Sequence, residues 1–65
     1  MSDLTQEQLL TYVDLAIEAL TPTLGPRMML RDIQRYLKEQ YGIEESIERI
    51  YEAEDIIHEL KNKES

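Results

Sequence analysis

Residues 21–26 read TPTLGP, and they divide the chain, because they hold both of its prolines and one of its two glycines. The residue before a proline is pushed out of the α region, so a first helix is predicted to end before Pro22. Pro26 is predicted to begin a second helix, where its missing N–H would have no partner in any case. The rest of the 65 residues lacks such breakers except at Gly42.

Three helices follow from these breakers and from the apolar spacing, and we expect them at about 6–20, 27–41 and 45–61. Thr5 and Gln8 have the spacing of a capping box at the start of the first helix. Gly42 is expected to close the second helix as a left-handed cap, with Ile43 folding back on Leu37. No alternation of period two reaches strand length, so the sequence predicts an all-α, compact three-helix bundle without a sheet.

The length and composition limit what this fold can be. A chain of 65 residues forms a single small helical domain over 1–65, and we expect residues 1–4 and 62–65 to fray. The chain has no Cys, so disulfides and thiolate metal sites are excluded, and the core must be helical and densely packed or else completed by a second chain. The residues expected to share this core are Val13, Ile17, Ile33, Leu37, Ile50 and Ile57.

The first helix has a wider apolar arc than a core stripe requires. Tyr12, Leu15 and Ala19 lie to one side of its stripe, and Met28 and Met29 beside Leu24 form an adaptable apolar cluster at the start of the second helix. One interpretation is that both other helices cover the first and that the methionines cap the core. The other is an interface with another protein or a second copy of the chain. The predicted partner-binding residues are Tyr12, Leu15, Ala19, Leu24, Met28 and Met29.

Charge is segregated within an acidic total. The formal net charge is −7, but one flank of the second helix carries four basic residues at spacings of 4, 4 and 3. This basic strip consists of Arg27, Arg31, Arg35 and Lys38. It either pairs with the acids of the other two helices or forms a surface for an acidic partner or phosphates.

The sequence offers no catalytic machinery. His58 is the only histidine, Cys is absent, and the two glycines are too far apart to form a phosphate-binding loop. A zinc site needs three or four ligands. We therefore predict a protein that is not an enzyme and that has no catalytic residues, no metal and no cofactor.

Nucleic-acid and membrane binding fit the charges poorly. The second and third helices have the order of a helix-turn-helix, but Glu44, Glu45, Glu48 and Glu52 crowd the end that would approach DNA, where basic residues supply most of the affinity. An interfacial membrane helix needs Lys and Arg on its polar face, and the first helix has neither. Direct nucleic-acid binding and membrane binding are therefore not expected.

The function predicted is that of a small acidic, non-enzymatic protein–protein interaction module, an adaptor or regulator. It would bind another protein, or itself as a homodimer, through the first helix and the Met28–Met29 junction. A helix-turn-helix regulator of nucleic acid and an acidic inhibitor of a nucleic-acid-binding protein are the alternatives. The acidic first residues lack the basic region of a secretory signal, so we expect a cytoplasmic protein.

Overall fold

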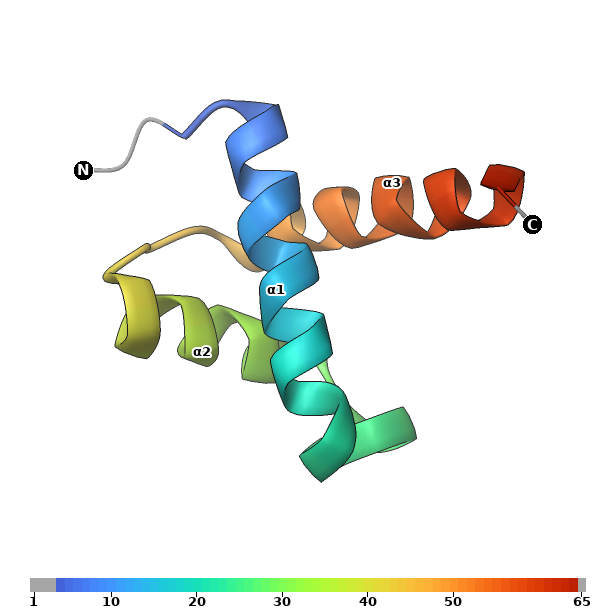
Figure 1. Cartoon of the computed structure of the whole chain (residues 1–65). Coiled ribbons are helices and arrows are strands. Elements are labelled where there is room, and N and C mark those ends of the chain that lie inside the picture. The colour runs from blue at the N-terminus through green and yellow to red at the C-terminus, as the bar shows by residue number, and fades with distance from the viewer. Residues whose placement is uncertain (1–3, 65) are drawn as a thin grey trace.

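The computed structural model describes residues 4–64, and this part of the chain is all-α, with three helices and no strand. The helices are α1 (Gln6–Leu24), α2 (Leu30–Tyr41) and α3 (Ile47–Glu64), and the short 3₁₀ helix η1 (Gly25–Arg27) follows α1. In Figure 1, α1 crosses in front of α2 and α3, which run in opposite directions behind it. The prediction of a three-helix bundle without a sheet is confirmed for the described residues.

The predicted capping box begins α1. The Thr5 hydroxyl accepts a hydrogen bond from the Gln8 backbone N–H at 3.2 Å, and the Thr5 N–H donates to Gln8 Oε1 at 3.0 Å. Two backbone groups that the first turn leaves without helical partners are thereby satisfied. Leu4, directly before the cap, packs against the core and fixes the direction in which the chain enters the helix.

The predicted end of α1 is wrong, because the helix continues through Pro22 to Leu24. Pro22 is exposed in the last turn, so its ring meets solvent and its missing N–H removes a single bond, the one to the Glu18 carbonyl. The Thr21 hydroxyl also donates to the Ile17 carbonyl. The helix ends at Gly25, whose φ of 53° is costly for any other residue and whose N–H donates to the Thr21 carbonyl.

The predicted start of α2 is wrong by three residues. Pro26 lies in the first turn of η1, and α2 begins only at Leu30. Asp32 determines this start, since its Oδ2 accepts a hydrogen bond from the Met29 backbone N–H at 2.9 Å. A carboxylate in the first helical turn also interacts favourably with the helix dipole.

The end of α2 is as predicted. Gly42 has φ 69° and ψ 21°, in the left-handed region, and its N–H donates to the Lys38 carbonyl at 3.0 Å. The Ile43 N–H donates to the Leu37 carbonyl at 3.2 Å, and both of these side chains are buried. The Gly42 bond, which reaches back to the carbonyl four residues earlier, is that of the αL C-terminal motif, and from this cap the chain turns toward α3.

The core lies where α1 crosses the other two helices. Its buried residues are Leu9, Val13, Ala16, Ile33, Leu37, Ile43, Ile50, Ala53 and Ile57. Five of the six predicted core residues are among them, and the sixth, Ile17, is half-buried and packs against them. A single small core of this kind is what a chain of this length can form.

Residues 1–3 and 65, part of the segments expected to fray, lie outside the described residues, whereas α3 is helical up to Glu64. Between residues 4 and 64, no helix has both the length and the apolar character needed to cross a membrane.

Candidate partner-binding site

Three tyrosines from α1 and α2 form one aromatic cluster on the surface. The ring centroids of Tyr12 and Tyr41 are 5.0 Å apart, and those of Tyr36 and Tyr41 are 6.1 Å apart in an edge-on arrangement. Leu15 and Ala19 lie one and two turns beyond Tyr12 on the same side of α1. We call these five residues the tyrosine band.

The tyrosine band is partly anchored in the core and partly open to solvent. Tyr12 and Tyr36 are half-buried and pack against the core, whereas Leu15 and Tyr41 each leave 42% of their surface exposed. Ala19 is also exposed. The half-buried rings restrict the movement of their neighbours, so the band presents a preformed apolar surface across two helices.

The Tyr41 phenol remains protonated at physiological pH. Partial desolvation against its neighbours raises the pKa of Tyr41 above its ordinary value of 10.0, and the nearby Tyr36 and Tyr12 phenols raise the pKa further. A neutral hydroxyl both donates and accepts a hydrogen bond. The band therefore combines apolar area with polar tips, the combination that makes tyrosine common in protein interfaces.

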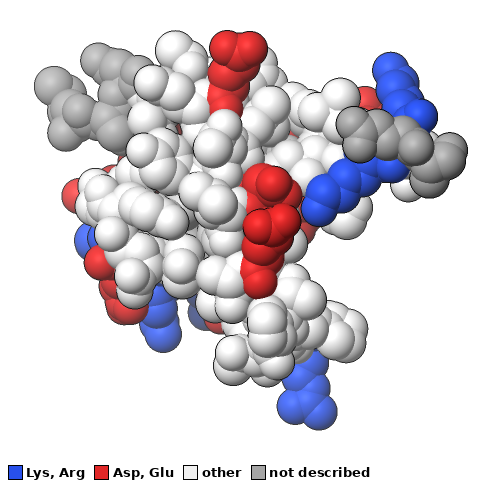
Figure 2. Space-filling view, viewed as in Figure 1, with Lys and Arg blue, Asp and Glu red and all other residues white. Residues whose placement is uncertain are grey.

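Acidic residues border the tyrosine band on both sides. Glu18 lies one turn beyond Leu15 on α1, and on α2 Asp32 and Glu39 lie one turn before and one turn after Tyr36. None of these three carboxylates forms an ion pair with a described residue. Figure 2 shows an uncharged surface beside α1. Acidic side chains, in red, lie over α1 and at the α2 edge of this surface, and basic side chains, in blue, lie next to them at the α2 edge.

The Met28–Met29 junction lies apart from the tyrosine band. Met28 is half-buried against the core and Met29 is 62% exposed. Both line a shallow hollow of about 410 Å³ between the start of α2 and α3, to which Ile47 and Glu54 contribute. Leu24, at the end of α1, is half-buried. The six predicted partner-binding residues thus do not form one continuous patch with the aromatic cluster.

The basic strip does not pair with the acids of α1 and α3. Among residues 4–63 the ion pairs are Arg49–Glu45 and Lys61–Asp14, at 3.2 and 3.5 Å, and neither includes Arg27, Arg31, Arg35 or Lys38. The internal pairing considered from the sequence is therefore absent from this part of the chain. Arg31, Arg35 and Lys38 are exposed because Ile33 and Leu37 turn the opposite face of α2 toward the core, and Arg27 lies before α2, in η1.

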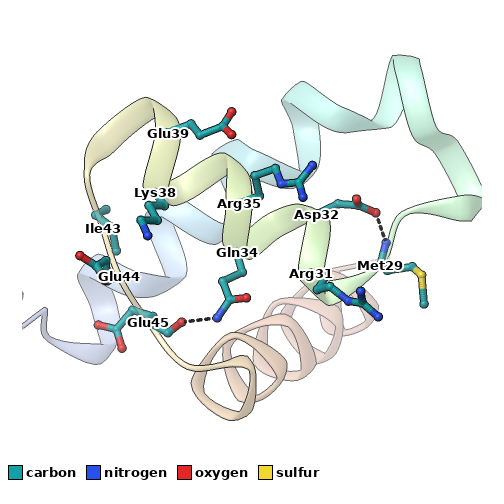
Figure 3. Close-up of a pocket in the computed structure, with 10 residues that line it drawn as sticks. All are labelled: Met29, Arg31, Asp32, Gln34, Arg35, Lys38, Glu39, Ile43, Glu44 and Glu45. Atoms are coloured by element: carbon teal, nitrogen blue, oxygen red, sulfur yellow. Dashed lines mark hydrogen bonds between the residues drawn. The ribbon is translucent and has the colours of Figure 1, made fainter.

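Three members of the basic strip line a groove that lies between α2 and residues 42–46 and measures about 1030 Å³. Figure 3 shows Arg31, Arg35 and Lys38 in this groove together with acidic side chains from both walls. Those acids are Asp32, Glu39, Glu44 and Glu45. Because basic and acidic side chains both line the groove, its charge favours neither an anionic nor a cationic ligand. Gln34 fixes its width by donating from Nε2 to the Glu45 carbonyl at 2.9 Å.

The start of α3 is not arranged like a DNA-recognition helix. Arg49 is the only basic residue in its first turns, and its guanidinium donates to the Glu45 carboxylate at 3.2 Å and to the Leu4 carbonyl at 3.4 Å. Glu44, Glu48 and Glu52 are exposed at this end, whereas the Glu45 side chain is mostly buried in its ion pair with Arg49. His58 is exposed on the same helix, and the described residues contain no group of three acids or histidines placed to hold a metal.

No family model, no curated protein and no solved structure matches this chain. The tyrosine band is the strongest candidate site on its own geometry. Tyr36 and Tyr41 were not among the predicted partner-binding residues. Their spacing along α2 gives no signal, since it is the crossing of α1 over α2 that brings Tyr41 to Tyr12.

Proposed function

We propose that this protein is a small acidic, non-enzymatic protein–protein interaction module, an adaptor or regulator, and that the tyrosine band is its docking surface. The observation that supports this most is the Tyr12–Tyr41 contact at 5.0 Å, which joins α1 and α2 into one apolar surface. The predicted interface on α1 is thereby extended onto α2, while Met29 serves at most as a secondary contact. A cytoplasmic location is part of the same proposal.

The tyrosine band has the features of an interface core. Binding energy in interfaces comes mainly from a few aromatic or apolar residues that become fully desolvated, and Leu15 and Tyr41 still have 42% of their surface to bury. Tyr12 and Tyr36 are already held against the core, so little side-chain entropy is lost when a partner binds. Such a surface supports binding without any chemical step.

Affinity capture with matched variants tests this function. Leu15→Glu places a charge in the tyrosine band, and Leu60→Glu makes the same change at a residue of α3 that is 53% exposed and lies outside the band. We expect wild type and Leu60→Glu to retain the same protein from a cell extract, and Leu15→Glu to lose it. Circular dichroism of all three should show equal helix content.

Two outcomes would contradict the proposal. One is that Leu15→Glu retains every protein that wild type retains. The other is that capture depends on Leu60 instead of Leu15, which would place the interface on α3. Either result would remove the tyrosine band from the function.

A further inference from the structure

We propose that the partner presents a basic amphipathic helix, which lies on the tyrosine band between α1 and α2. This inference rests on the proposed function and adds the chemistry of the partner. It follows from two independent properties of the band, its shape and the charge at its borders.

The shape of the tyrosine band suits a helix. Tyr12 to Ala19 spans eight residues, a rise of about 10 Å along the α1 axis, which matches about two turns of a partner helix. The exposed surface of two packed helices offers ridges and grooves that a third helix can enter. A partner helix would use apolar anchors at i, i+3 or i+4 and i+7, the usual pattern for a helix bound in a groove. Leu15 and Tyr41, the most exposed large members of the band, would contact these anchors.

The charge at the borders selects a basic partner. α1 carries three acids and no Lys or Arg, and its Glu18 lies directly beside the band. On α2, Asp32 and Glu39 are the charged residues nearest to Tyr36 around the helix, and Arg35 lies farther around, away from Tyr36. A bound helix therefore meets carboxylates along both flanks. Lys and Arg at its flanking positions would pair with them and speed the encounter.

The same charges argue against a second copy of this chain as the occupant. A symmetric dimer through α1 would bring two helices together that both carry only acids. Glu18 of each copy would lie at the border of the shared interface without a cation from either α1. Like charges placed opposite one another across an interface oppose binding.

A library of displayed helical peptides tests the partner chemistry. Each peptide has 18 residues, with Leu or Trp fixed at four anchor positions and with Lys, Gln or Glu allowed at every flanking position. Selection uses the full 65-residue chain, and the selected clones are then titrated with wild type, Leu15→Glu and Leu60→Glu. We expect these clones to be enriched in Lys at the flanks. Their affinity should fall at least about 30-fold with Leu15→Glu, as for an interface hot spot, and be unchanged with Leu60→Glu.

Added salt and NMR supply the remaining readouts. Affinity should fall as salt is raised, since the flanking pairs are exposed, and amide shift changes should centre on Tyr12, Leu15 and Tyr41. Leu15-dependent clones with Glu or Gln flanks would overturn the basic partner and leave the proposed function standing. A library without any Leu15-dependent clone, or shift changes confined to the acids of α3, would overturn the helical occupant. Concentration-dependent shifts of the band in the free protein would assign it to a second copy instead.

Discussion

Replacing Leu37 by alanine measures how much the small core contributes to stability. Leu37 is completely buried where α2 meets the rest of the bundle, and it is among the largest fully buried side chains. The substitution removes three carbons, worth about 2.4 kcal/mol at ~0.8 kcal/mol each. The cavity adds to this, so we expect a loss of about 3–4 kcal/mol, within the range for buried leucines. A domain of 65 residues has about 3–10 kcal/mol in all, so the loss is a large fraction of it.

Urea unfolding followed by circular dichroism at 222 nm measures this loss. Leu60→Ala is the matched control, since it makes the same substitution on a side chain that is 53% exposed, and it should cost less than about 1 kcal/mol. The slope of the unfolding free energy against urea should be the same for both variants. A loss below about 0.5 kcal/mol for Leu37→Ala, or equal losses for the two variants, would show that α2 does not bury this face.

Four further outcomes follow from the structure. Gly42→Ala should lower the free energy of unfolding by about 1–2 kcal/mol, because φ is 69° there. No atom lies within 4 Å of the added Cβ, so the loss comes from the backbone conformation alone. An unchanged urea midpoint would contradict the left-handed cap. Pro22→Ala should raise the free energy of unfolding by about 1–2 kcal/mol, since an N–H becomes available to the Glu18 carbonyl; a loss would show that the proline ring stabilises the last turn of α1. The raised pKa of Tyr41 means that folding favours its protonated form, so this contribution to stability is present below about pH 10 and is lost as the pH rises through the raised pKa. In a pH titration followed by absorbance at 295 nm, the phenol transition at the highest pH should be present in wild type and missing in Tyr41→Phe. In fluorescence anisotropy with a DNA duplex at ~150 mM salt, we expect binding no tighter than micromolar, because the start of α3 is acidic; a sub-micromolar constant would refute this.

The sequence predicted those helix ends that depend on a few neighbouring residues. The Thr5–Gln8 capping box and the Gly42 cap each satisfy their hydrogen bonds within a short stretch, so the residue types suffice to identify them. The two ends around residues 21–26 were wrong for a different reason. The cost of Pro22 depends on how near the end of its helix and how exposed it is, and the start of α2 depends on a bond from Asp32 that competes with the preference of Pro26.

The candidate site was only half predictable, because it depends on how the helices cross. Tyr12, Leu15 and Ala19 follow from the wide apolar arc of α1, which the sequence shows directly. Tyr41 joins them only because the packing of α1 against α2 brings its ring to within 5.0 Å of the Tyr12 ring. The basic strip forms no ion pair with the described acids of α1 and α3, and no spacing within α2 contains that information.

The connections between the helices have a consequence for the rate of folding. Five residues join α1 to α2, three of them in η1, and five join α2 to α3. Closing loops this short costs little chain entropy, and helical bundles dominated by nearby contacts fold in microseconds to milliseconds. We therefore expect this chain to refold within that interval after each spontaneous opening. Its apolar stripes are then exposed too briefly for other chains to encounter them, which protects a domain of low total stability from aggregation.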